Sequence, residues 1–166
     1  MTARACISLG SNVDADANLR AALVALRGLF GPLEMSHIYE TPAVGFSGEP
    51  FLNMVVAMPA TGSPAAAMEA LRAIESAQGR HRGEQKFAPR TIDLDLLTWG
   101  GLVEGRLPRE DIVEYDFVLG PMAELAGQEL HPVIGRSYQS LWEDMQARGS
   151  ALKRLEEARE RAILHA

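Results

Sequence analysis

Two aspartates, Asp93 and Asp95, stand one residue apart within a run of isoleucine and leucine. Pro89 precedes this run and Gly100-Gly101 follows it, which is typical of a buried strand. Because successive strand side chains point to opposite faces, both carboxylates would share one face, about 6.6–6.8 Å apart. A hard cation such as Mg²⁺ would relieve their repulsion, since it binds one or two carboxylates together with phosphate oxygens. The alternation alone is equally typical of a solvated sheet face.

The segment before this strand is basic, although the chain carries a net charge of −6. It contains Arg80, His81, Arg82, Lys86 and Arg90. Guanidinium groups bind phosphates, so a basic loop that leads into paired carboxylates indicates a site for a metal–nucleotide complex. The alternatives are a solvated charged turn or a nucleic-acid patch, and the pI near 5.2 argues against nucleic acid as a partner.

The residues from Lys86 to Leu97 resemble the signature of the hydroxymethyl-dihydropterin pyrophosphokinases, the ATP-dependent enzymes of folate biosynthesis. Several other segments resemble the same family in the same order, from about residue 5 to about residue 147. They are Ile7 to Asn12, Asn18-Leu19, Tyr39 to Gly45, Phe51 to Asn53, Glu75 and Gln78 to Arg82. Several motifs in the right order are far more specific than any one of them.

The resemblance implies transfer of a pyrophosphoryl group from ATP to the hydroxymethyl group of 6-hydroxymethyl-7,8-dihydropterin, with release of AMP. It implies that Asp93 and Asp95 hold two Mg²⁺ ions, and that Arg80 and Arg90 neutralise charge on the group being transferred. Three further residues would contact ATP: Arg82, Glu75 and Arg109. For Glu75 the alternative is a side chain that merely sits in solvent.

The resemblance also implies a pterin pocket. Phe51 and Phe117 match the two stacking positions, and Asn53 matches the residue that hydrogen-bonds the pterin edge. The loop residues expected to line the same pocket are Thr41, Pro42 and Val44. For the phenylalanines, simple core packing remains an alternative, because Phe at a strand end is usually buried.

The stretch from Leu107 to Phe117 departs from the family pattern. Arg109 stands where a histidine is usual and Tyr115 where an arginine is usual, and the stretch is acidic. The chain is therefore expected to be a divergent branch with the same activity, or a paralogue acting on another bicyclic alcohol. A non-catalytic nucleotide-binding module on the same fold is a third possibility.

Length and composition favour one domain over residues 1–166, with residues 148–166 as a C-terminal helical extension. The single cysteine, Cys6, excludes an intramolecular disulfide and fits a reducing compartment. No signal peptide and no apolar run long enough to span a membrane is recognisable, so we expect a cytoplasmic monomer that binds neither membrane nor nucleic acid.

Hydrophobic periodicity predicts an α+β protein with a mostly antiparallel sheet and helices packed on its faces. Strands are expected over 5–9, 33–39 and 51–58 and at the Asp-x-Asp run, with a hairpin into 102–107. Helices are expected over 17–30, 63–78, 121–125 and 138–147, and in a C-terminal segment capped by Ser150. The order β-α-β-β-α-β is that of a ferredoxin-like α/β sandwich, which the resemblance also implies.

Overall fold

A computed structural model describes residues 3–42, 48–79 and 91–165. Its strands are β1 (Arg4–Ser11), β2 (Glu34–Met35), β3 (Tyr39–Thr41), β4 (Phe51–Pro59), β5 (Asp93–Trp99) and β6 (Lys153–Arg154). Its helices are α1 (Ala15–Phe30), α2 (Pro64–Ala77), α3 (Asp111–Glu114), α4 (Asp116–Ala126), α5 (Tyr138–Ala147) and α6 (Glu157–Leu164). In the described part of the chain, no helix is long and apolar enough to cross a membrane.

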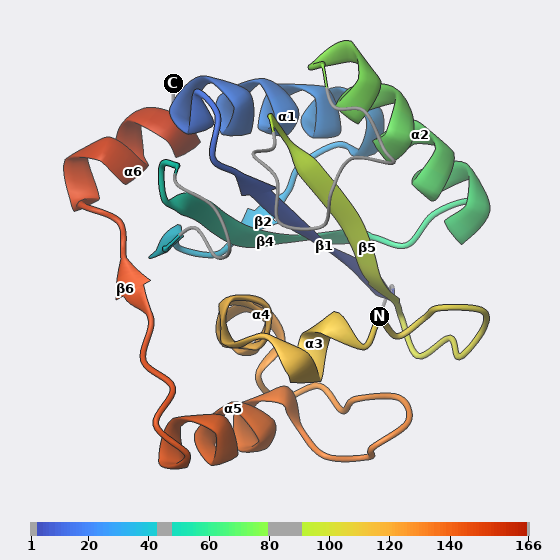
Figure 1. Cartoon of the computed structure of the whole chain (residues 1–166). Coiled ribbons are helices and arrows are strands. Elements are labelled where there is room, and N and C mark those ends of the chain that lie inside the picture. Colours follow the sequence, from blue (N-terminus) through green and yellow to red (C-terminus); the bar gives the residue numbers. More distant parts are fainter. Residues whose placement is uncertain (1–2, 43–47, 80–90, 166) are drawn as a thin grey trace.

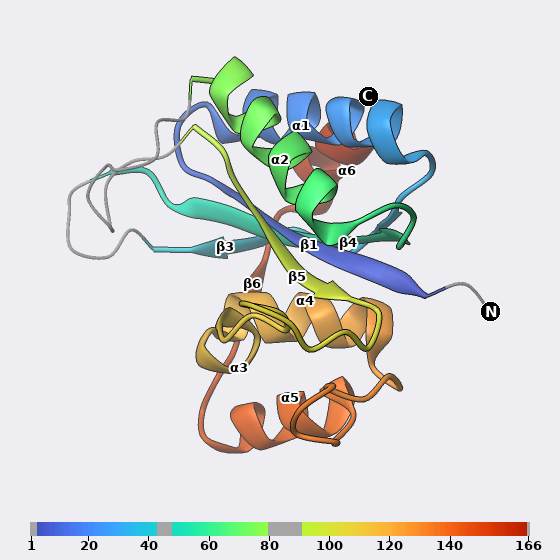
Figure 2. The ribbon, with the colours of Figure 1, turned by 90° about the vertical axis from the view of Figure 1, so that its right-hand side faces the viewer.

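The strands form one sheet in the order β5-β1-β4-β3-β6, with β2 also paired to β4. Every described pairing is antiparallel. Helices α1 and α2 cover one face of the sheet, while α3 and α4 cover the other (Figures 1 and 2). The predicted ferredoxin-like α+β fold is therefore confirmed, with β5 at one edge of the sheet.

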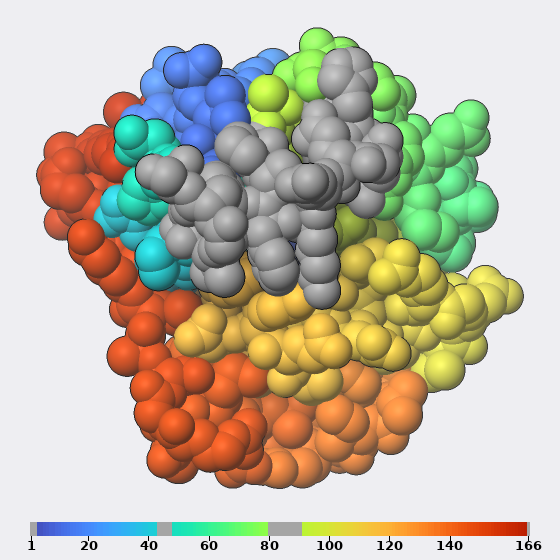
Figure 3. Space-filling view, viewed as in Figure 1, coloured from blue at the N-terminus to red at the C-terminus, as the bar shows by residue number. Residues whose placement is uncertain are grey.

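Each sheet face has its own apolar core. On the α1 and α2 face, the core includes Leu23 and Leu71 of the helices and Leu94 of β5. On the opposite face, Val55 and Leu97 pack with the apolar residues of α4 and α5. Helix α5 lies outside α4, so the two helices form successive layers below the sheet (Figures 1 and 3).

The predicted strand over 33–39 is broken into β2 and β3, because side chains bind the backbone between them. The amide of His37 donates to Glu124 Oε2 at 2.8 Å, and the amide of Ile38 donates to Glu160 Oε1 at 2.8 Å. The side-chain oxygen of Ser36 accepts from the amide of Val55 at 2.9 Å in place of a backbone carbonyl. These contacts interrupt the ladder for three residues.

Three other element predictions need correction. Residues 102–107 form no strand and make only an isolated bridge between Glu104 and Leu107. The backbone groups of these two residues hydrogen-bond to each other, three residues apart, and not to a strand of the sheet. Helix α4 begins five residues before Pro121, with Tyr115 as its N-cap in extended backbone. Glu156, not Ser150, caps the C-terminal helix, and its carboxylate accepts from the amides of Ala158 and Arg159.

The segment expected as a helical extension contains a strand as well as a helix. Strand β6 pairs with β3, and α6 packs beside α1 (Figure 1). Arg159 of α6 forms a bidentate ion pair with Asp16 of α1, with its Nη2 2.7 Å from Asp16 Oδ1. The C-terminal segment thus adds the strand next to β3 at the edge of the sheet and packs its helix against α1.

Candidate active site

The two aspartates and the expected pterin-binding asparagine lie on one face of the sheet. Strand β1 runs between β4 and β5, and its Gly10 is paired with Asn53 on one side and Asp93 on the other. One step further, Ser8 lies opposite Asp95. Asn53 and Asp93 therefore lie on either side of Gly10. The amide of Asn53 and the two carboxylates are separated on this face only by Gly10 and Ser8 of β1, which have small side chains.

Asp93 and Asp95 point to the face covered by α3 and α4, while Leu94 points into the core beneath α1 and α2. The predicted alternation is therefore confirmed, but the alternative of a solvated face is wrong for Asp95. Asp95 is only 9% exposed. Its Oδ1 lies 3.7 Å from Arg72 Nη2 and 3.7 Å from Arg109 Nη1. Two guanidinium groups thus compensate the burial of this carboxylate.

At the outer edge of β5, two side chains of α2 bind the backbone of Leu94. Glu75, 1% exposed, accepts from the amide of Leu94 at 2.8 Å. Arg72 Nη1 donates to the carbonyl of Leu94 at 2.9 Å and to Glu75 Oε1 at 2.9 Å. The alternative of a solvent-exposed Glu75 is wrong, and its expected contact with ATP stays a prediction. Arg72 is not among the site residues predicted from the sequence, where its one signal is the i, i+3 spacing to Glu75.

Arg109 lies beside Asp95, and its expected contact with ATP stays a prediction. Its side chain is 15% exposed, and its Nε lies 3.2 Å from Asp111 Oδ1. The backbone amide of Arg109 donates to the carbonyl of Leu97 at 2.9 Å, which fixes it against β5. Of the acids in this stretch, Asp111 pairs with Arg109, while Glu110 and Glu114 are exposed.

Three of the expected pterin residues, Phe51, Asn53 and Phe117, lie on the same side of the sheet as Asp95. Asn53, 7% exposed, donates from Nδ2 to Thr41 Oγ1 at 2.9 Å, which orients its amide. Phe51 and Phe117 are half-buried. The ring of Phe117 stacks on Tyr115 with centroids 5.1 Å apart and planes at 24°. Pro42 is exposed at the end of β3.

Several predicted residues lie outside the described residues. They are Arg80, Arg82, Arg90 and Val44. The chain just beyond two of these gaps is anchored to the end of β1. Ser11 Oγ donates to the carbonyl of Thr91 at 2.5 Å, and Asn12 Nδ2 donates to the carbonyl of Glu49 at 3.2 Å. Ser11 and Asn12 therefore hold the segments that contain Thr91 and Glu49 against the end of β1.

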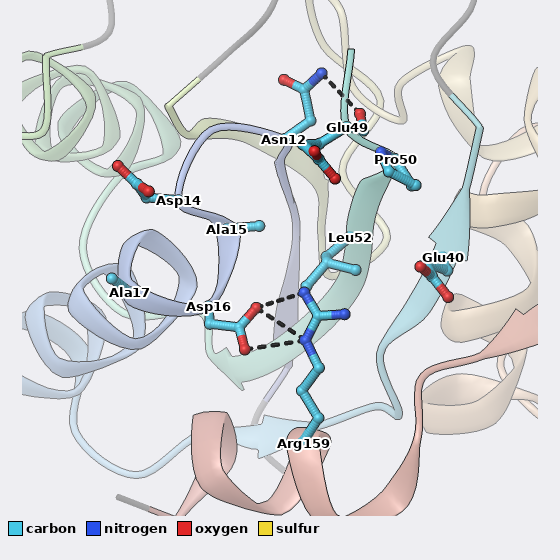
Figure 4. Close-up of a pocket in the computed structure, with 10 residues that line it drawn as sticks. All are labelled: Asn12, Asp14, Ala15, Asp16, Ala17, Glu40, Glu49, Pro50, Leu52 and Arg159. Carbon is cyan, nitrogen blue, oxygen red and sulfur yellow. Dashed lines mark hydrogen bonds and ion pairs between the residues drawn. The ribbon is translucent and has the colours of Figure 1, made fainter.

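A cavity of about 520 Å³ lies on the other face of the sheet from the aspartates, at the start of α1 (Figure 4). Leu52 and Glu40 form one wall, and the Asp16–Arg159 ion pair forms another. The hydrogen bond from Arg159 holds the pKa of Asp16 below its usual value. This cavity is separate from the Asp93 and Asp95 site.

The family model for 7,8-dihydro-6-hydroxymethylpterin-pyrophosphokinase (HPPK) matches residues 6–127. The chain belongs to this family. Every predicted site residue lies within the matched range, whereas α5, β6 and α6 lie beyond it. The match therefore includes the signature at residues 86–97 and the strand residues that carry Asn53, Asp93 and Asp95.

Two bacterial relatives carry the name 2-amino-4-hydroxy-6-hydroxymethyldihydropteridine pyrophosphokinase. The Pseudomonas aeruginosa protein is 36% identical over 135 residues, covering 76% of this chain and 82% of that protein. The Pseudomonas putida protein is 37% identical over 119 residues, covering 69% of this chain and 97% of that protein. An Arabidopsis thaliana folate synthesis bifunctional protein is 33% identical over 130 residues, which are 74% of this chain but only 27% of that protein.

Solved HPPK-DHPS structures share the fold. One from Plasmodium falciparum superposes with a TM-score of 0.72 over 89% of this chain and 46% of that chain. The sequence identity is 12%, so this likeness supports the fold alone. Together with the family match, it agrees with the ferredoxin-like arrangement predicted from the element order.

Proposed function

We propose that the protein transfers the pyrophosphoryl group of ATP to the hydroxymethyl oxygen of 6-hydroxymethyl-7,8-dihydropterin, releasing AMP, as a step of folate biosynthesis. The observation that carries this proposal is the shared sheet face of Asn53, Asp93 and Asp95, with Gly10 between the first two. An amide that can read a pterin edge thus stands beside two carboxylates suited to a metal–phosphate complex. HPPK membership supports the same activity.

In this reaction a bond forms between the hydroxymethyl oxygen and the β-phosphorus, while the bond from that phosphorus to the α,β-bridging oxygen breaks. The protein's task is to align the two substrates and to compensate the phosphate charge. Asn53, held by Thr41, would orient the pterin, and Phe51 and Phe117 would stack on its ring. Arg109, with the predicted Arg80 and Arg90, would contact the phosphates, and Arg82 and Glu75 are further candidates for ATP binding.

The donor set fits magnesium held jointly by protein and nucleotide. In the described ranges, no group of three or more His, Cys, Asp or Glu side chains could hold a metal ion by itself. Two carboxylates on one strand face match the preference of Mg²⁺ for one or two carboxylates completed by phosphate oxygens and water. Asp93 and Asp95 would hold two such ions, which when bound neutralise charge on the phosphates.

Product analysis tests this proposal. Purified protein with Mg²⁺, ATP and the pterin should yield AMP and pterin pyrophosphate, and EDTA should stop the reaction. ADP as the nucleotide product would contradict pyrophosphoryl transfer. Turnover only with another bicyclic alcohol would favour the paralogue, and nucleotide binding without AMP release would favour a binding module. We further propose that the protein is a monomer in the cytoplasm. Light scattering of the purified protein tests its oligomeric state.

A further inference from the structure

Strand β5 carries both site aspartates, yet it is the edge strand of the sheet and pairs only with β1 among the described strands. An edge strand presents backbone N–H and C=O groups with no neighbouring ladder, and it is the less firmly held side of a sheet. The aspartates are the residues on either side of Leu94. The outer edge of Leu94 therefore decides how firmly both carboxylates are positioned.

Helix α2 binds both backbone groups of Leu94 through two side chains. Glu75 accepts from the amide of Leu94, and Arg72 donates to its carbonyl, at 2.8 and 2.9 Å. The two side chains are linked to each other at 2.9 Å, so that the acceptor and the donor stand in fixed register, as they would in a neighbouring strand. The other amino group of Arg72 lies 3.7 Å from Asp95 itself.

We infer that Arg72, together with Glu75, is a positioning residue for the reaction: it holds the Leu94 peptide so that Asp93 and Asp95 present their carboxylates in one fixed arrangement. This inference rests on the proposed function, and it gives Glu75 a role in holding β5 that does not depend on its proposed contact with ATP. The planar guanidinium is essential to it, because one group serves the Leu94 carbonyl, Glu75 and Asp95 together. A lysine ammonium in the same place is a point donor without that fork.

Kinetics of Arg72→Ala and Arg72→Lys test the inference. Both variants should lower kcat by about 10-fold to 100-fold, since a misplacement of roughly 1 Å at a reacting group can cost about 100-fold in rate. The KM for the pterin should stay within about twofold, because Asn53 and Thr41 are untouched. A purely structural role would lower stability and leave kcat of the folded enzyme unchanged.

Hydrogen exchange of the Leu94 amide provides a readout that does not depend on activity. In Glu75→Ala this amide loses its acceptor and should exchange faster by about tenfold or more than in the wild type, while amides of β4 keep their rates. Arg72→Ala should accelerate the same amide. Matched controls are Glu69→Ala, an exposed acid of the same helix, and Arg148→Ala, an exposed arginine at the end of α5.

The outcomes separate the inference from the proposed function. AMP release by the wild-type protein tests the function, whereas Leu94 exchange tests the pairing even in a protein that releases none. A folded Arg72→Ala variant with normal kcat would overturn the inference. So would full recovery of kcat in Arg72→Lys, because that would reduce the role of Arg72 to its charge. Should Arg72→Ala fail to fold, the lysine variant decides alone.

Discussion

A β-carbon added to Gly10 would lie 3.1 Å from Oδ1 of Asn53 on the neighbouring strand. That approach is tight enough to displace the amide, which is held on its other side by Thr41. Gly10 therefore leaves room for the observed orientation of the Asn53 amide.

We predict that Gly10→Ala raises the KM for the pterin by about tenfold, the equivalent of one disturbed hydrogen bond of roughly 1–1.5 kcal/mol. The KM for ATP should change little. Steady-state kinetics with each substrate varied in turn measures both. Gly28→Ala is the control, because a β-carbon at this position in α1 would meet nothing within 4 Å beyond its chain neighbours and the backbone of its own helix. Equal pterin KM values in the two variants would contradict the role given to Gly10.

Asp95→Asn should abolish most turnover, by about 100-fold or more, because it removes a charge where charge stabilisation carries the reaction. Asparagine has the same shape, so the variant should remain folded. Asp95→Ala is a poorer test of the charge, because Asp95 is buried between Arg72 and Arg109 and its loss would also change the packing there. Single-turnover rates paired with thermal melting test this. Asp144→Asn on α5 is the control and should retain full activity; a comparably active Asp95→Asn would remove Asp95 from the metal site.

The part of this site that follows from local periodicity could be predicted from the sequence. Alternation at two residues assigns Asp93 and Asp95 to one face and Leu94 to the other, and both assignments are confirmed. The start of α2 could also be predicted from neighbouring residues alone. Ser63 caps the helix and accepts from the amide of Ala66, and Pro64 follows at the first helical position.

Features that depend on distant segments could not be predicted. The strand breaks at residues 36–38 because Glu124 and Glu160, 87 and 122 residues further along the chain, bind the intervening amides. Arg72 and Glu75 look like any surface pair at i, i+3 until β5 is packed against α2. The burial of Asp95 likewise requires Arg109 to be brought across the face of the sheet.

Arg109→Ala should raise the KM for ATP by about tenfold, because a phosphate contact by a guanidinium is a charge-assisted bond worth roughly 1.5–3 kcal/mol. The pterin KM should stay nearly constant, since Arg109 contacts Asp95 and Asp111 rather than Asn53. Initial rates at varied ATP provide the measurement. Arg106→Ala, an exposed arginine of the preceding loop, is the matched control. An unchanged ATP KM would mean that this side of the nucleotide site is built from other residues.

Glu160 joins α6 to the rest of the protein, because its buried carboxylate accepts from the amide of Ile38 at 2.8 Å and from Arg154 at 3.0 Å. Burial is the largest effect on this carboxyl and raises its pKa. The hydrogen bonds from Arg154, Ile38 and His37 together outweigh it and hold the pKa below its ordinary value near 4.5. A carboxyl with a lowered pKa in the folded state stabilises the fold above its unfolded pKa, and this stabilisation is lost as the pH falls through the folded pKa.

We therefore predict that Glu160→Gln lowers the free energy of unfolding by about 1–3 kcal/mol at pH 7, since it weakens bonds to a buried charged group. The difference from the wild type should shrink as the pH falls below about 4.5, where the wild-type carboxyl also becomes protonated. Urea unfolding at a series of pH values measures both curves. Glu157→Gln, an exposed neighbour paired only with Arg161 among the described residues, should follow the wild type throughout. Parallel curves for Glu160→Gln and the wild type across this range would show that the carboxylate's charge does not hold α6 in place.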